Sequence, residues 1–200
     1  TDDYAAQELL SVIPTRCVGL DIALGTGGLP RGMVIEVFGP ESAGKSTFVY
    51  HVIASVNGLG GRVLIIDTEF AWTDGKYPRA IGIMPELVTI LTPASGEQAI
   101  GVALDMVRKG MIDLVVIDSV AGLTPKKEIK GAVEIKDIAL QARMMSAAMR
   151  LFAEPLHRTG TMALMVNQLR DKPGVAYGAR EVPPGGRALR FQAAVRLDIR

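Results

Sequence analysis

Short runs of consecutive aliphatic residues recur along the chain, and each run ends at a glycine or a polar residue. Runs that are apolar on both faces are typical of strands inside a parallel sheet. Longer segments between them have apolar residues at a spacing of three or four, which indicates helices. The alternation predicts an α/β fold with a mostly parallel central sheet flanked by helices. Strands are expected at residues 33–38, 62–69, 87–91, 114–119, 161–168 and 191–199, and the main helices at residues 46–57, 96–109 and about 137–156.

The beginning of the chain is predicted to be peripheral to this sheet. Residues 4–13 have Ala, Leu and Gln at helical spacing, and residues 18–24 indicate a second short helix. We therefore expect residues 1–32 to form an N-terminal peripheral segment and residues 33–200 to form the core of one domain.

The composition narrows the class of protein. A hydrophobic content of 48% in 200 residues is enough for one domain with a substantial core. The formal net charge of +1 gives no general attraction to nucleic acid, so a DNA-binding surface would have to be a local basic patch. No apolar run reaches the roughly 18 residues that a membrane helix needs. The single cysteine, Cys17, excludes an internal disulfide and is expected to be buried. We expect a cytoplasmic protein with no membrane partner.

Residues 39–47, GPESAGKST, follow the first predicted strand with the spacing G-x-x-x-x-G-K-[ST]. The two glycines allow successive backbone N–H groups to converge on a polyphosphate, and the next helix adds the positive end of its dipole. Lys45 is expected to neutralise the β- and γ-phosphates, and the Ser46 hydroxyl to bind Mg²⁺. The motif predicts a nucleoside triphosphate site formed by Glu41, Ser42, Ala43, Gly44, Lys45, Ser46 and Thr47.

Carboxylates stand at the ends of two later predicted strands. Since ligands bind at the carboxyl ends of the strands in open α/β sheets, both carboxylates should lie near the phosphate loop. Glu69 could orient or deprotonate the water that attacks the γ-phosphate, or it could be a solvated charge at a strand end. Asp118 follows four aliphatic residues, which is the Walker B pattern, and is expected to position Mg²⁺ through its water shell.

An amide and several arginines complete the candidate chemistry. The predicted strand 161–168 ends at Gln168, whose amide can donate to a γ-phosphate and change position when that group leaves. Arg143 and Arg150 are seven residues apart, so they share one face of a predicted helix. They could follow a phosphate backbone or be solvated side chains on a packing helix.

Two segments between predicted elements, residues 124–136 and 169–187, are expected to be loops. The first is charged and contains glycine, and the second has three prolines, four glycines and several basic residues. Loops this long inside compact domains are usually functional or disordered.

Further tracts outside the phosphate loop are specific enough to indicate a family. They are LDIALG at 20–25, DTE at 67–69, GEQA at 96–99, VIDSVA at 116–121, LTPK at 123–126, QARMMS at 141–146, NQLR at 167–170, GGRALRF at 185–191 and VRLDIR at 195–200. With these tracts the chain resembles the RecA recombinases of bacteria and their phages over almost its whole length. Generic P-loop ATPases share only the phosphate loop and Asp118.

The resemblance implies a RecA-like P-loop NTPase that hydrolyses ATP with Mg²⁺. Glu69 would activate the attacking water, and Asp118 would position Mg²⁺ together with Ser46. Gln168 would sense the γ-phosphate and couple it to the loop that follows. Asp74 and Tyr77 would contact adenine, although their spacing from Glu69 is one residue longer than the usual pattern.

The resemblance also implies that the protein binds single-stranded and double-stranded DNA as a helical filament of identical subunits. The loops around residues 130–137 and 170–187 would contact DNA, and Phe191 would pack across the subunit boundary. Pro173 and Ile138 replace a larger aliphatic residue and a methionine that are usual at the two wedge positions, and Phe70 stands where histidine is common. The implied DNA-binding residues are Ile138, Arg143, Ser146, Arg150, Arg170, Lys172, Pro173, Gly185, Gly186 and Arg187.

Relative to this family the core is expected to be truncated at both ends. The helix and linker that join neighbouring subunits would be missing or shortened at the N-terminus. The lysines that complete the ATP site from the next subunit would lie beyond residue 200. We therefore expect the 200 residues alone to bind nucleotide, to hydrolyse it slowly and to form filaments weakly.

Three functions remain open from the sequence. The first is the DNA-dependent ATPase core of a recombinase that forms filaments for homologous pairing and strand exchange in DNA repair. The second is a RecA-fold ATP-binding scaffold or regulator that oligomerises without exchanging strands. The third is a ring-forming DNA translocase, against which the long glycine- and proline-rich loop and the family-specific tracts argue.

Overall fold

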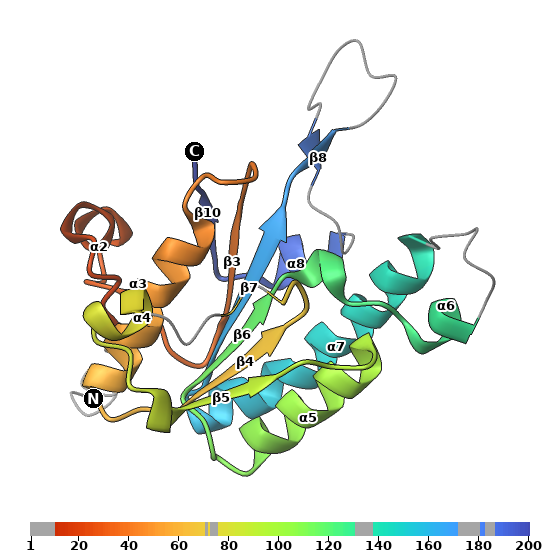
Figure 1. Cartoon of the computed structure of the whole chain (residues 1–200), viewed down its shortest axis with the longest axis horizontal. Helices are drawn as coiled ribbons and strands as arrows, with labels where there is room; N and C mark the ends of the chain where they lie inside the picture. Colours follow the sequence, from red (N-terminus) through yellow and green to blue (C-terminus); the bar gives the residue numbers. More distant parts are fainter. Residues whose placement is uncertain (1–10, 71, 73–75, 131–137, 172–180, 183–186) are drawn as a thin grey trace, which may run out of the picture.

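Six parallel strands form the central sheet of the computed structural model, which describes residues 11–70, 72, 76–130, 138–171, 181–182 and 187–200. The strand order is β10-β3-β7-β6-β4-β5 (Figure 1). This arrangement confirms the predicted α/β fold with a parallel sheet. The strands are β3 (Val34–Gly39), β4 (Val63–Asp67), β5 (Val88–Leu91), β6 (Leu114–Asp118), β7 (Met162–Gln168) and β10 (Val195–Asp198).

Helices cover both faces of the sheet, which explains the continuous apolar runs. One core lies between the sheet and α3 (Lys45–Gly58), and the other lies between the sheet and the helices α5 (Gly96–Arg108), α7 (Ile138–Thr159) and α8 (Arg187–Gln192) (Figure 1). Within β6, Val116 belongs to the first core and Ile117 to the second. In the described part of the chain, no helix is long and apolar enough to cross a membrane.

The parallel register places the ends of four strands at one edge of the sheet. Asp67 at the end of β4 pairs with Asp118 at the end of β6. Gly39 at the end of β3 pairs with Gln168 at the end of β7. The chemistry-bearing positions that the sequence identified are therefore neighbours in space, as expected for the carboxyl edge of a parallel sheet.

The N-terminal part differs from the predicted pair of helices. The helix α2 (Val18–Leu24) is present, but Val12–Ile13 form strand β1, which pairs with β2 (Leu29–Pro30). Pro14 disfavours the helical conformation at Ile13, and burial of Ile13 in the α3 core favours an extended chain. The rest of the predicted first helix, residues 4–10, lies outside the described residues.

The prediction that Cys17 is buried is wrong. Its side chain is exposed, because it directly precedes α2, a helix with no buried residue. Arg16 beside it adopts a left-handed φ of 63° and holds this segment to the domain. Its guanidinium donates to the Ala54 carbonyl at 2.9 Å and to the Ser55 hydroxyl at 3.2 Å.

The last predicted strand is too long at its beginning. Phe191 and Gln192 belong to α8, and the strand starts only at Val195. The helix is favoured because it buries Leu189 against the α5–α7 core.

The expected loop 124–136 contains a short helix, and β8 and β9 pair within the expected loop 169–187. The remaining short elements are α4 (Lys76–Ala80), η1 (Pro85–Leu87), η2 (Val120–Gly122), α6 (Lys126–Lys130), β8 (Arg170–Asp171) and β9 (Glu181–Val182).

Candidate nucleotide-binding site

The phosphate loop joins the end of β3 to the first residue of α3. Ser42 and Gly44 have positive φ angles of 60° and 96°, which turn the backbone before the helix begins. The Lys45 side chain is nearly buried, and its Nζ donates to the Gly39 carbonyl at 3.2 Å and to the Pro40 carbonyl. The loop carbonyls therefore hold the ammonium group against the phosphate loop.

A cavity of about 330 Å³ lies beside this loop. Its walls bring together residues from α3 and from the carboxyl ends of β4, β6 and β7. Thus the structure places the predicted groups Lys45, Glu69, Asp118 and Gln168 around one space. The lining residues are Glu41, Ser42, Gly44, Lys45, Ser46, Thr47, Glu69, Asp118, Val166 and Gln168.

Glu69 is held at the cavity by two hydrogen-bond donors. The Gln168 side-chain amide donates to Oε1 of Glu69 at 2.7 Å. The Ser119 hydroxyl donates to the same oxygen. These contacts link the segment after β4 to the ends of β6 and β7, so Glu69 is fixed next to the phosphate loop although its side chain is exposed.

Asp118 lies in an electronegative part of the site. Its pKa is raised to about 6, mainly by burial and then by the negative charges of Glu69 and Asp67. A hydrogen bond from the Ser46 hydroxyl, at 3.4 Å, and the charge of Lys45 act in the opposite direction. A bound cation would remove the repulsion and restore the carboxylate form.

The donor set near Ser46 and Asp118 fits magnesium. Both residues offer oxygen ligands, which Mg²⁺ prefers, and they already face each other across the cavity. The described residues hold no cluster of three or more acidic, histidine or cysteine side chains that could bind a metal by themselves. That is the usual arrangement for Mg²⁺, which keeps several waters and shares its remaining ligands with substrate phosphates.

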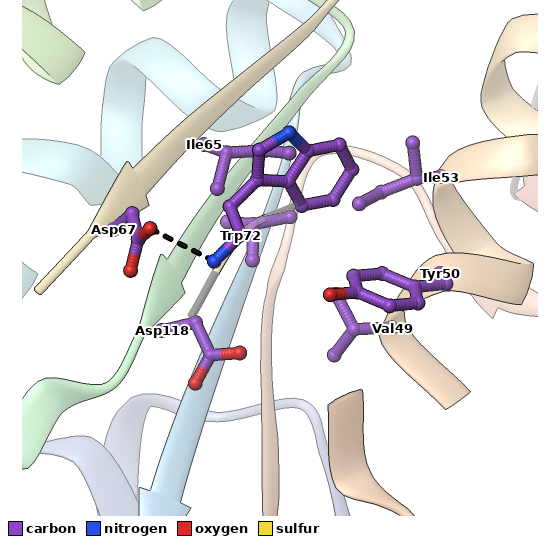
Figure 2. Close-up of a pocket in the computed structure, with 8 residues that line it drawn as sticks. Val49, Tyr50, Ile53, Ile65, Asp67, Trp72 and Asp118 are labelled. Carbon is purple, nitrogen blue, oxygen red and sulfur yellow. Dashed lines mark hydrogen bonds between the residues drawn. The ribbon is translucent and has the colours of Figure 1, made fainter. Parts of the chain in front are cut away.

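A second, smaller pocket lies between α3 and the ends of β4 and β6 (Figure 2). Asp67 accepts a hydrogen bond from the backbone N–H of Trp72 at 3.0 Å and another from that of Glu69 at 3.2 Å. The Trp72 ring meets Tyr50 edge to face, with centroids 5.1 Å apart. Tyr77, a predicted adenine contact, lies 6.1 Å from Tyr50 between ring centroids and does not line the phosphate cavity.

Comparison with known proteins gives a family for this fold and site. A family model described as the RecA N-terminal domain matches residues 3–200. The chain belongs to the RecA family. It is similar to the protein RecA of Rubrobacter xylanophilus (50% identity over 198 residues), of Tropheryma whipplei (48% over 196) and of Nocardia farcinica (47% over 195), and these matches cover 98–99% of the chain. It spans 57%, 45% and 56% of those relatives, about half of their length.

Family membership confirms the resemblance, but it leaves the predicted DNA contacts of this RecA-family chain as predictions. Arg143 and Arg150 are exposed on α7. Ser146 is on the same helix, and its hydroxyl donates to the Ala142 carbonyl at 2.8 Å. Ile138 and Arg187 begin α7 and α8, and Arg170 lies in β8. The other predicted positions, Asp74, Lys172, Pro173, Gly185 and Gly186, lie outside the described residues.

Three residues of this RecA-family site were missed by the sequence reasoning. Asp67 and Thr68 directly precede Glu69, and Ser119 follows Asp118. Their roles depend on pairing between β4 and β6, which a single sequence does not specify. The signal that could have found them is the polar tail that both strands share, because paired parallel strands bring such tails together.

Proposed function

We propose that the chain is the ATPase core of a RecA-type recombinase. In this role it hydrolyses ATP to ADP and phosphate in a DNA-dependent reaction and assembles head to tail into helical filaments on single-stranded DNA. The filament takes up double-stranded DNA for homologous pairing and strand exchange in the cytoplasm. The observation that carries the proposal is the cavity where the phosphate loop, Glu69, Asp118 and Gln168 meet.

The residues of the cavity divide the work of phosphoryl transfer. Lys45 leaves the loop carbonyls and neutralises the β- and γ-phosphates. Ser46 and Asp118 would hold Mg²⁺, which would supply further positive charge at the phosphate oxygens. Glu69 orients the attacking water and accepts its proton. Gln168 donates its amide to the γ-phosphate and loses this partner after hydrolysis.

The predicted DNA-binding loop follows directly after the last residue of the nucleotide site. Gln168 is the last residue of β7, and β8 starts two residues later at Arg170. A change in the Gln168 partner therefore acts directly on the segment that carries the predicted DNA loop. In the proposed filament, Asp74 and Tyr77 contact adenine and Phe191 packs on the neighbouring subunit.

The proposed function is tested by the ATPase rate of the full-length protein with and without single-stranded DNA. We expect DNA to stimulate the wild-type protein, and Glu69→Gln to bind ATP normally while losing more than about 99% of turnover. Glu86→Gln is the matched control, because it removes an exposed carboxylate on η1 far from the cavity, and it should leave the rate unchanged.

Other outcomes would point to the alternative functions. ATP-driven assembly that is indifferent to DNA would favour the scaffold. Closed rings without filaments in electron micrographs would favour the translocase. The recombinase proposal would lose its support if DNA did not stimulate hydrolysis and if DNA binding showed no salt dependence.

A further inference from the structure

The side chain of Ser119 contacts Glu69, the carboxylate that we propose to be catalytic. The Ser119 side chain is completely buried, and its hydroxyl donates to Oε1 of Glu69. Gln168 donates to the same oxygen from the end of β7. Because both donors use Oε1, the second carboxylate oxygen is left to accept a proton from water.

Thr68 holds Ser119 in place through the backbone. Its hydroxyl accepts from the Ser119 N–H at 2.8 Å and donates to the Ser119 carbonyl at 2.8 Å. Gly122 packs closely over this hydroxyl, since a Cβ atom at position 122 would overlap Thr68 Oγ1. The serine is therefore fixed on both sides by the strand that leads to Glu69.

The two donors to Glu69 differ in what happens when nucleotide binds. Under the proposed function, Gln168 turns from Glu69 to the γ-phosphate. Ser119 is buried and does not line the phosphate cavity, so its contact with Glu69 does not compete with a contact to the phosphate. It remains as the donor that fixes the carboxylate while hydrolysis takes place.

We propose that Ser119 is the positioning residue for Glu69, and that Thr68 locks it in that role. The inference rests on the proposed ATPase function and adds residues that act through Glu69. Replacing Ser119 by alanine removes one oxygen atom but keeps both backbone contacts to Thr68. The fold and the phosphate loop are therefore expected to remain intact in Ser119→Ala.

The test measures steady-state ATP hydrolysis by the full-length protein with single-stranded DNA. We expect Ser119→Ala to lower kcat by between tenfold and a hundredfold, as for a slightly misplaced catalytic group. KM, the dissociation constant for ATP and the melting temperature should stay close to the wild-type values. A merely structural serine would instead lower the melting temperature or weaken ATP binding.

Two further variants make the test specific. Thr68→Ser keeps the hydroxyl and should keep kcat. Thr68→Val loses both contacts and should lower kcat as Ser119→Ala does, but it should also lower the melting temperature, because the buried Ser119 N–H and carbonyl lose their partner. In a Glu69→Asp background, whose carboxylate is one methylene shorter, Ser119→Ala should cost nothing more, because the contact is already lost.

The outcomes separate this inference from the function on which it rests. Wild-type turnover together with an unchanged kcat in Ser119→Ala would overturn the positioning role alone. A further loss of kcat when Ser119→Ala is added to Glu69→Asp would also overturn the positioning role. Wild-type protein without ATP turnover would overturn the proposed function and this inference together.

Discussion

Asp118 is the residue whose charge depends most on what the site contains. It is largely buried and close to Glu69 and Asp67, while Lys45 is the nearby cation. Without a divalent cation, the carboxylate form is therefore disfavoured, and the pKa of Asp118 rises to about 6. The same imbalance of charge that costs stability in the metal-free protein favours Mg²⁺ binding.

This imbalance predicts a pH-dependent stability. The folded-state pKa of Asp118 exceeds its usual value of 3.8, so this carboxyl group holds its proton more strongly in the folded protein. Its contribution to the free energy of unfolding therefore falls as pH rises from about 4 to about 7. In EDTA, the stability advantage of Asp118→Asn over wild type should grow by on the order of 1 kcal/mol between pH 5 and pH 8. Urea unfolding at both pH values measures it.

Magnesium and a second substitution provide the controls. Mg²⁺ should stabilise the wild-type protein at pH 8 and have much less effect on Asp118→Asn, because the ion needs the carboxylate. Asp105→Asn, at an exposed position of α5, should leave the pH profile unchanged. Parallel profiles for Asp118→Asn and wild type would contradict the electrostatic account.

At the scale of single residues, the sequence predicted the functional side chains that belong to a motif or that follow an apolar run. Lys45, Glu69, Asp118 and Gln168 were identified in that way, and they meet in one cavity. Ser119 was not, because serine after a strand has many ordinary roles and only the pairing of β4 with β6 shows its partner. The prediction that Cys17 is buried was wrong, because its burial depends on how the short helix α2 packs. The residues of that helix do not specify its packing.

Among the elements, β10 is held in the sheet by an ion pair between the buried Glu36 and the partly buried Arg196. Glu36 in the middle of β3 is 1% exposed, and its carboxylate accepts from Arg196 of β10 at 2.6 Å and from Asn167 of β7 at 3.0 Å. The Arg196 guanidinium also lies over the Phe38 ring, 4.6 Å from its centroid. One side chain of β3 thus ties both neighbouring strands.

Removing that carboxylate should destabilise the protein strongly. We expect Glu36→Ala to lower the free energy of unfolding by about 3 kcal/mol, because Arg196 and Asn167 lose their buried acceptor. Glu154→Ala, which breaks an exposed i,i+4 pair with Arg158, should cost less than about 0.5 kcal/mol. Denaturant unfolding of both variants measures the difference, and equal costs would contradict the assigned role of Glu36.

Helices and strands were predicted correctly where burial produced a clear pattern of apolar residues. The predictions failed where contacts of a few residues determined the local structure. The strands β3, β4, β6 and β7 lie inside the sheet and are mostly buried, so their apolar runs predicted them with errors at the ends only. The edge strand β5 is partly exposed, but its run of β-branched and aliphatic residues predicted it as well. The alternating segment 191–199 was read as one strand, but Leu189 draws its first residues into a helix against the core. Pro14 and the burial of Ile13 similarly replaced a predicted helix by β1.

At the scale of the whole molecule, Phe191 is a large aromatic side chain that a single subunit leaves exposed to solvent. It is 81% exposed on α8, which is unusual for a large aromatic residue. Phe191→Ala should therefore leave the unfolding free energy within about 0.5 kcal/mol of wild type. It should weaken ATP-dependent assembly on DNA by roughly tenfold or more, as expected for an aromatic contact at a subunit boundary.

Sedimentation and electron microscopy of the full-length protein would measure this assembly. Val18→Ala is the matched control, because Val18 is 73% exposed on α2 and has no assigned role in assembly. Normal filaments in Phe191→Ala, or equal losses in both variants, would remove Phe191 from the proposed interface.

The pairing of β10 with β3 determines when a chain that is still being synthesised can form its nucleotide site. Arg196 pairs with Glu36 across 160 residues of sequence, and the Ile199 N–H donates to the Phe38 carbonyl at 2.8 Å beside the phosphate loop. Contacts of such separation slow folding, because a long loop must close first. During synthesis the strand that leads into the nucleotide site keeps an open edge until residues 195–199 have left the ribosome. Nucleotide binding by the nascent chain should therefore appear late, only after residues 195–199 have left the ribosome.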